Sequence, residues 1–266
     1  MTEQRAIYLN KKKREKIALK LAQIGLLVLF ICGWEVLAQR GIIDAFIMSS
    51  PSRIVSTMAN FQTNGLIHHA GVTFLETVIG FTLGVMIGLV VSYLLWASRF
   101  LSKMMAPYLV VFHALPKIAL GPIIIIWVGA GMQAVITMAL AISVVVTIME
   151  MVAGFEATDT DLLKLASTLG ASKWQLFSKI VFPSNLHTFF NALKINIGLS
   201  LVGVIAGEFL VSRAGLGFLI IYGGQVFQMD LVMTSVVVLA FMAVLFHLLI
   251  IMFDALVTKY FHQPKK

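Results

Sequence analysis

The sequence predicts an all-α membrane protein of about six transmembrane helices, and two observations support this fold class. First, 59% of the 266 residues are hydrophobic and only 12% are charged, whereas about a quarter of the residues of a soluble domain are charged. So few charges cannot cover a water-exposed surface of this size. Second, spanning a bilayer as a helix takes about 20 mostly apolar residues. Six stretches meet this requirement: residues 17–38, 71–97, 106–128, 132–154, 189–212 and 231–258.

The hydrophilic stretches are all too short to fold by themselves. We therefore expect a single transmembrane domain over residues 17–258, between a basic segment, 1–16, and a tail, 259–266. The first apolar stretch is longer than the core of a signal peptide, and no small-residue cleavage site follows it, so we expect it to be retained. The one cysteine, Cys32, lies within it, which excludes an intrachain disulfide.

Lysine and arginine are distributed unevenly between the segments that connect the spans. With the N-terminus inside, segments 1–20, 98–105, 155–194 and 259–266 face the cytoplasm and hold sixteen of the 20 basic residues, against three in the outer segments. The positive-inside rule then predicts that both termini and the long hydrophilic stretch 155–188 are cytoplasmic. The same distribution explains the net charge of +8 as membrane anchoring, so we expect no nucleic-acid partner.

Glycines recur every four residues in two of the spans. Gly80, Gly84 and Gly88 share one face of the second span, and Gly203 and Gly207 share a face of the fifth. Small residues at this spacing let helix backbones approach closely in a bilayer. We expect these faces to pack within one chain.

The hydrophilic stretch 155–188 contains the pattern of two short amphipathic helices. The first begins after Asp159 or Thr160, whose oxygens can cap a helix, and Gly170 ends it. Ser172 begins the second with a capping box completed by Gln175, and the proline at 183 ends it. Both helices have apolar faces without a visible core to cover them, a pattern typical of an interaction site. A surface helix on the inner leaflet is the alternative.

Ionisable side chains inside spans are costly and indicate function by default. The predicted spans contain Glu35, Glu76, Lys117, Glu150, Glu208 and Asp254. Those at 35, 150 and 254 lie near span ends, where we expect them to reach water.

The remaining three, Glu76, Lys117 and Glu208, are candidate residues of a transport pathway. Lys117 follows Pro116, where we expect a helix break that lines a cavity or is buried in protein. Its ammonium group either attracts an anionic solute or pairs with one of the two glutamates.

Residues 164–183 resemble the EAA loop of binding-protein-dependent ABC importer permeases. The positions in register with that motif are Ala166, Gly170, Ile180 and Pro183. Lys164 and Leu165 stand where the motif has Glu and Ala, and Phe182 stands where it has Leu, so no salt bridge from that Glu is expected. Further segments resemble the nitrate/sulfonate/taurine/bicarbonate subgroup: 49–55, 115–122, 126–131, 207–209 and 215–217.

The resemblance implies a type I importer permease in the bacterial inner membrane, whose partners are an ABC ATPase, an extracytoplasmic binding protein and a second permease copy. It implies alternating access for a small anionic or heterocyclic solute, without naming the solute or deciding between homodimer and heterodimer. The residues expected to couple to the ATPase are Ala166, Leu169, Gly170, Ala171, Ser172, Trp174, Ile180 and Pro183.

Other functional classes find less support in the sequence. A secondary transporter or channel would account for six spans and buried charges, but not for a capped cytoplasmic helix pair. An intramembrane enzyme would need a nucleophile with a base, or a metal-ligand pair, and neither is evident; the adjacent His68 and His69 do not share a helix face. No phosphate-binding Gly-x-x-x-x-Gly-Lys-Ser/Thr loop occurs. We therefore expect no cofactor, no metal and no catalysis by this chain, with ATP hydrolysis on a separate subunit.

Overall fold

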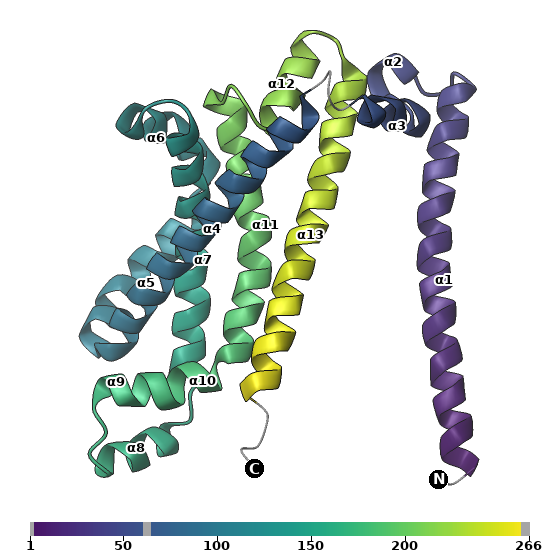
Figure 1. Cartoon of the computed structure of the whole chain (residues 1–266). Helices are drawn as coiled ribbons and strands as arrows, with labels where there is room; N and C mark the ends of the chain where they lie inside the picture. Colours follow the sequence, from purple (N-terminus) through teal and green to yellow (C-terminus); the bar gives the residue numbers. More distant parts are fainter. Residues whose placement is uncertain (1–2, 61–64, 262–266) are drawn as a thin grey trace. The chain divides into compact units, whose positions relative to one another are not determined.

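The structure, a computed structural model, describes residues 3–60 and 65–261, and these residues form helices and connections without a strand (Figure 1). The predicted tail lies mostly outside the described residues, at 262–266, as do the first two residues of the basic segment. The chain divides into two compact units, residues 1–64 with 223–234 and residues 65–222 with 235–266. Each unit is described by itself, and the prediction of a single domain stays a prediction.

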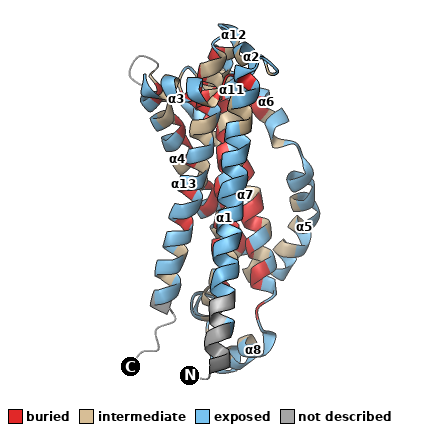
Figure 2. Ribbon diagram, turned by 90° about the vertical axis from the view of Figure 1, so that its right-hand side faces the viewer, coloured by how far each residue is buried: buried red, intermediate tan, exposed pale blue. Residues whose placement is uncertain are grey.

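Unit 1 holds the first span and a short helical connection. Its elements are α1 (Glu3–Gln39), α2 (Ala45–Met48), α3 (Pro51–Ala59) and the beginning of α13. From residue 12 onward, the residues of α1 are exposed almost throughout, as Figure 2 shows. Helix α3 begins at a proline, which suits a first helical position, and the Ser50 hydroxyl accepts a hydrogen bond from the Arg53 N–H at 3.4 Å. The helix therefore begins as a capped helix should.

Unit 2 contains the other spans. Its elements are α4 (Leu66–Ala97), α5 (Arg99–Ala114), the 3₁₀ turn η1 (Lys117–Leu120), α6 (Gly121–Val128), α7 (Met132–Glu156), α8 (Thr160–Thr168), α9 (Lys173–Leu176), the π-helical turn η2 (Phe177–Val181), α10 (Phe182–Ser184), α11 (Leu186–Val211), α12 (Leu216–Gln225) and α13 (Met229–Phe261). Helices α12 and α13 continue across the unit boundary.

Five helices of the described chain are long and apolar enough to cross a membrane, and a bent pair brings the number to six. The predicted span 106–128 is this pair: α5 ends at Ala114, and residues 117–128 continue at 89° to it. Proline at 116 explains the break, because the residue before a proline resists helical torsions. The prediction of an all-α protein with about six spans is confirmed, and only the third span is not a single straight helix.

The core of unit 2 is built around α7, which packs against both α4 and α11. A Cβ atom added to Gly80 would lie 2.6 Å from the Cβ of Ala139, and one added to Gly84 would lie 2.6 Å from the Cβ of Ser143. Gly203 of α11 also lies against α7, where a Cβ on it would be 2.9 Å from the Cα of Ala139. The predicted glycine faces thus allow close helix packing within the chain.

Candidate functional sites

Unit 2 has candidate sites at both ends. The end at which α12 lies is called the α12 end below, and the opposite end, where α8, α9 and α10 lie, is called the loop end (Figure 1).

At the loop end, α8 has the predicted limits. The Asp159 carboxylate caps it by accepting a hydrogen bond from the Asp161 N–H at 2.8 Å. Gly170 follows with φ +83°, a left-handed conformation that glycine adopts without steric cost. The cap and the stop read from the sequence therefore define this helix.

The second helix begins as predicted and continues differently. The hydroxyl of Ser172 accepts from the Gln175 N–H at 3.3 Å, and the Gln175 side chain accepts from the Ser172 N–H at 2.8 Å, which completes the capping box. The expectation that Pro183 ends the helix is wrong: a π-helical turn intervenes, and Pro183 lies in the first turn of α10. Phe182, the residue before the proline, keeps helical torsions (φ −64°, ψ −46°), and the helix ends only after Ser184.

Aromatic side chains fix this second helix to the bundle. The ring centroid of Phe177 lies 4.7 Å from that of Tyr93 and 5.7 Å from that of Trp96, both on α4. On α7, the Phe155 ring lies 5.2 Å from it in edge-to-face geometry, which favours aromatic pairs. Val181 is fully buried in the same cluster. The expectation of an uncovered apolar face is therefore wrong for this helix.

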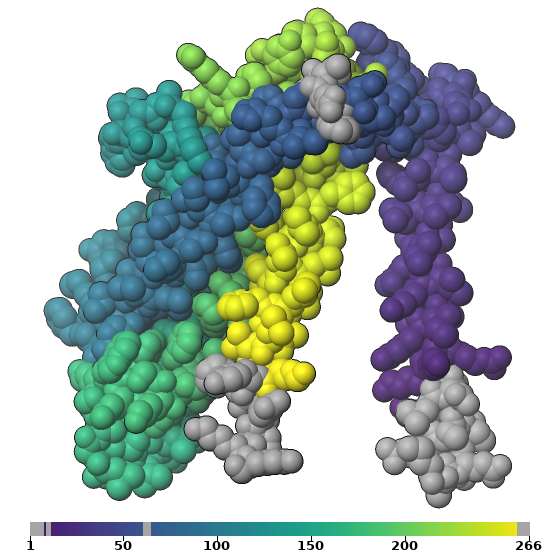
Figure 3. Space-filling view, viewed as in Figure 1, coloured from purple at the N-terminus to yellow at the C-terminus, as the bar shows by residue number. Residues whose placement is uncertain are grey.

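The apolar face of α8, in contrast, is largely uncovered in this chain, although Leu163 packs against the buried cluster that contains Phe155 and Val181. No residue of α8 is buried, and Leu162, Leu165 and Leu169 are 49%, 60% and 80% exposed. Trp174, at the start of α9, is 60% exposed. Figure 3 shows this segment at the end of unit 2. An exposed leucine face on a capped helix, beside an exposed tryptophan, is a surface of the kind that binds a partner.

The eight predicted coupling residues divide by exposure. Leu169, Gly170, Ser172 and Trp174 are exposed, whereas Ala166, Ala171, Ile180 and Pro183 are half-buried.

At the α12 end, the side chain of Glu208, a residue of α11, lies against the N-terminal turn of α12. Its carboxylate, 1% exposed, accepts hydrogen bonds from the Thr73 hydroxyl at 2.7 Å and from the Gly217 N–H at 2.5 Å. The Leu216 N–H donates to the Thr73 oxygen at 2.8 Å, and the Gly215 N–H donates to Nδ1 of His69 at 3.0 Å. Side chains of α4 and α11 thus satisfy the free N–H groups of the first turn of α12, and a carboxylate there suits the helix dipole.

Two glycines make room for this contact. Gly215 has φ +113°, and a Cβ on it would overlap the carboxyl group of Glu208. A Cβ on Gly217 would lie 2.8 Å from the Cβ of Glu208. We call the arrangement of His69, Thr73 and Glu208 around residues 215–217 the α12 clamp.

Glu76 lies beside the clamp. It is 1% exposed, and its carboxyl group lies next to that of Glu208. Its Oε2 has no hydrogen-bond partner among the residues that the structure describes, and Glu76 lines a cavity of about 430 Å³ that Arg213 also lines. Two of the three predicted pathway residues are therefore in contact.

The third, Lys117, lies apart from this pair. Its ammonium group donates to the His113 carbonyl at 3.1 Å and forms no ion pair with either glutamate in the described part of the chain. The alternative of a Lys117–glutamate pair is therefore not formed.

Sequence reasoning missed two members of the clamp, His69 and Thr73. With Glu76 they occupy positions i, i+4 and i+7 of one helix, so they share a face. This polar stripe on an otherwise apolar helix was the available signal.

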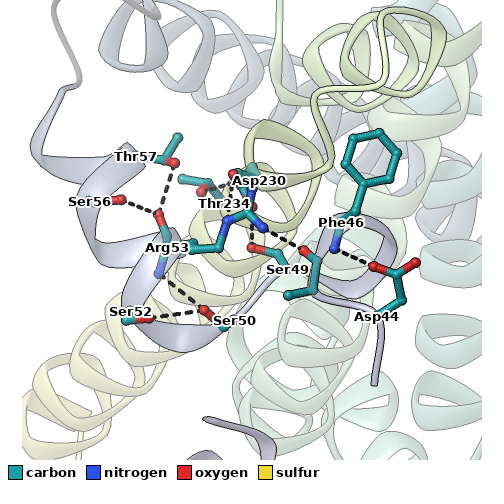
Figure 4. Close-up of polar contacts among 11 residues, drawn as sticks. Asp44, Phe46, Ser49, Ser50, Ser52, Arg53, Ser56, Thr57, Asp230 and Thr234 are labelled. Atoms are coloured by element: carbon teal, nitrogen blue, oxygen red, sulfur yellow. Dashed lines mark hydrogen bonds and ion pairs between the residues drawn. The ribbon is translucent and has the colours of Figure 1, made fainter. Parts of the chain in front are cut away.

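In unit 1, an ion pair joins α3 to the start of α13 (Figure 4). The guanidinium group of Arg53 lies 2.7 Å from Asp230 Oδ2 and donates to the Ala45 carbonyl at 2.9 Å. The Ser49 hydroxyl donates to Asp230 Oδ1 at 2.7 Å. Ser49 has φ 57°, unusual for a residue other than glycine, and this contact holds it there.

Two of the acids expected to reach water at span ends have protein partners. Glu35 accepts hydrogen bonds from the N–H and the hydroxyl of Ser52 at 2.9 and 2.8 Å. Asp254 forms a 2.7 Å ion pair with Lys194. Within residues 3–60 and 65–261, no group of three or more His, Cys, Asp or Glu side chains is placed to hold a metal ion.

Comparison with known proteins places these features in a family. Residues 80–262 match the family described as "Binding-protein-dependent transport system inner membrane component". A "Probable ABC transporter permease protein" of Haemophilus influenzae is 30% identical, over 81% of this chain and 86% of the relative. The "Putative aliphatic sulfonates transport permease protein SsuC" of Bacillus subtilis is 26% identical, over 81% of this chain and 79% of the relative.

Among solved structures, an inward-facing MetNI methionine ABC transporter chain matches with a TM-score of 0.65 at 21% identity, over 72% of this chain and 95% of that chain. This likeness shows the fold. Because the family match covers more than half of the chain, the chain belongs to the binding-protein-dependent transport system inner membrane components, the permease subunits of ABC importers.

Proposed function

We propose that two copies of this chain form the membrane pathway of an ATP-driven importer for a small anionic or heterocyclic solute. An ABC ATPase docks on α8 and the start of α9, and a binding protein delivers the solute at the opposite, α12 end. The observation that carries the proposal is the uncovered leucine face of α8 beside a helix anchored in the bundle.

A docking helix transmits force only if it is connected to the spans. Trp174 contributes both to the exposed surface and to the anchor, because its ring lies 5.5 Å from Tyr93 of α4 and 5.9 Å from Phe177. Through these rings, a displacement of α9 acts on α4 and α7 directly. This connection supports alternating access driven by movement of the loop end.

The loop end faces the cytoplasm and both termini are cytoplasmic in this proposal, in the inner membrane of a bacterium. The distribution of basic residues supports this orientation: Arg99, Lys103, Lys164, Lys173 and Lys179 all lie at or near the loop end. The α12 end then faces the binding protein.

Glu76, Glu208 and Lys117 remain candidates for the pathway. The unpaired Oε2 of Glu76 at a cavity supports contact between this cavity and a polar solute, since a buried polar atom without a partner favours a ligand that supplies one. Lys117, a half-buried residue with a positively charged ammonium group, supports attraction of an anion. The sulfonate relative supports an anionic solute.

Affinity capture of the tagged chain from gently solubilised native membranes, with identification of co-purifying proteins, tests the proposal. The variant Leu165→Glu/Leu169→Glu places two charges on the leucine face of α8. The matched control Ser167→Glu/Thr168→Glu adds the same charges to neighbouring exposed positions of the same segment. We expect the ATPase with the wild type and the control, and its loss with the leucine variant.

Retention of the ATPase by the leucine variant would refute docking on α8. A chain that is captured alone, and that transports in proteoliposomes without ATP, would establish the secondary transporter instead.

A further inference from the structure

A polar pocket of about 360 Å³ lies at the loop end, between the turn that joins α4 to α5 and the connection from α7 to α8. Its lining consists of Leu95, Trp96, Arg99, Ser102, Lys103, Phe155, Glu156, Thr158, Thr160 and Leu163. Four helices contribute to it, and neither the predicted coupling residues nor the α12 clamp are part of it.

The pocket has an excess of positive charge. Arg99 and Lys103 line it, and neither forms an ion pair in the part of the chain that the structure describes. The one carboxylate in the lining, that of Glu156, already accepts a hydrogen bond from the Ser102 hydroxyl at 3.1 Å. Beside the pocket, Lys173 donates to the Ala97 carbonyl at 2.9 Å. Two unpaired cations and nearby hydroxyl groups form a suitable environment for a phosphate group.

The surface next to these cations is apolar. On α5, Phe100, Met104 and Tyr108 are 79%, 46% and 57% exposed, and they alternate with the two basic residues along the helix. A free phosphate ion would gain nothing from such a surface. A phospholipid matches both the cations and the apolar surface, because its phosphate group can pair with the cations while its acyl chains cover the apolar side chains.

We infer that this pocket binds the headgroup of an anionic phospholipid, with Arg99 and Lys103 pairing with its phosphate. Pockets of this kind between transmembrane helices bind anionic headgroups elsewhere. The bound lipid also touches α8, since Thr160 and Leu163 line the pocket. Because α8 has no buried residue of its own, a headgroup held here braces it against the α4–α5 turn.

The inference requires neither transport nor an ATPase, so it can be tested on the purified chain. Wild type and variants are exchanged into nanodiscs that contain phosphatidylcholine, with or without a small fraction of phosphatidylglycerol. Lipid retained after transfer to detergent is counted by native mass spectrometry. The test variant is Arg99→Ala/Lys103→Ala. The matched control, Lys164→Ala/Lys179→Ala, removes two exposed cations of the loop end outside the pocket.

We expect the wild type and the control to retain one phosphatidylglycerol per chain in preference to phosphatidylcholine. Each basic residue near an anionic headgroup contributes roughly fivefold in affinity, so the double variant should bind about twenty-fivefold more weakly. The single variant Arg99→Lys keeps the positive charge, so it should bind phosphatidylglycerol nearly as tightly as the wild type. Hydrogen exchange over residues 160–168 should slow with phosphatidylglycerol in the wild type and not in the double variant.

Three results would overturn the inference. The double variant could retain phosphatidylglycerol like the wild type. The control could lose it equally, which would indicate unspecific attraction to basic residues. Millimolar inorganic phosphate could displace the lipid from the wild type, which would show a site for free phosphate.

Discussion

The two ends of unit 2 are stabilised by different kinds of contact, hydrogen bonds at the α12 end and aromatic packing at the loop end. At the α12 end, one carboxylate, one hydroxyl and one imidazole satisfy the backbone N–H groups of α12. At the loop end, the contacts are between rings, and Phe177 contacts rings of α4, α7 and α9. Hydrogen bonds depend on direction, and the loss of one partner leaves a buried polar group unsatisfied. Contacts between aromatic rings depend less on direction, so the rings can shift by small distances and remain packed.

This difference suits a transporter whose two ends do different work. The α12 clamp has one arrangement that satisfies its donors and acceptors. Its hydrogen bonds are therefore either all formed or broken, without intermediate arrangements. The aromatic cluster can shift by small amounts while it remains packed, so it can carry a movement from α9 to the spans. Substitutions at each end can show whether the contrast holds.

The largest effect is expected for Gly215→Ala in the clamp. The new Cβ would overlap the carboxyl group of Glu208, and alanine at φ +113° is strained. We expect a loss of about 3 kcal/mol in unfolding free energy, by analogy with strained and overpacked sites. Denaturation of the purified chain in mixed micelles measures it.

Gly198→Ala in α11 is the control for Gly215→Ala, because a Cβ at that position meets nothing within 4 Å. It should leave stability unchanged or raise it by up to about 1 kcal/mol. Equal losses in the two variants would show that the clamp does not require Gly215.

Phe177→Ala should have the next largest effect, at the loop end. Removal of a ring that contacts Tyr93, Trp96 and Phe155 leaves a cavity, and complete burial would cost about 3–5 kcal/mol. Since Phe177 is half-buried, we expect about 2 to 3 kcal/mol, and less for Phe177→Leu. In the assembled transporter, ATP hydrolysis should persist while uptake falls. Parallel loss of both would contradict a transmitting role.

Glu208→Ala should cost about 2 kcal/mol, since it leaves the buried Gly217 N–H without its acceptor and removes the stronger of the two acceptors of the Thr73 hydroxyl, which also approaches the His69 carbonyl at 3.2 Å. Glu208→Gln keeps one acceptor oxygen and should lose about half as much. The same denaturation experiment distinguishes them. If the two variants were equally stable, the acceptor oxygen that glutamine retains would contribute nothing to holding α12.

The sequence predicted the loop end far better than the α12 end, because their contacts differ in range. Asp159, Gly170 and the capping box at Ser172 act within a few residues, so their types and spacing were enough. The clamp joins positions that are 135 and 143 residues apart, and no local pattern pairs Thr73 with Glu208. The break at Pro116 was predictable from the missing N–H, whereas its 89° angle depends on packing.

The smallest effect on stability is expected where the largest effect on partner binding is proposed. Leu165 is 60% exposed on α8, so Leu165→Ala removes little buried surface and should change the unfolding free energy of the isolated chain by less than about 0.5 kcal/mol. The same variant should weaken ATPase binding measurably, because leucine at the centre of a docking face becomes buried only in the complex. Titration of the purified ATPase against the chain in nanodiscs compares the two affinities. A variant that destabilises the isolated chain while it binds the ATPase normally would show that Leu165 belongs to an internal contact of the loop end, and that the leucine face of α8 is not the docking surface.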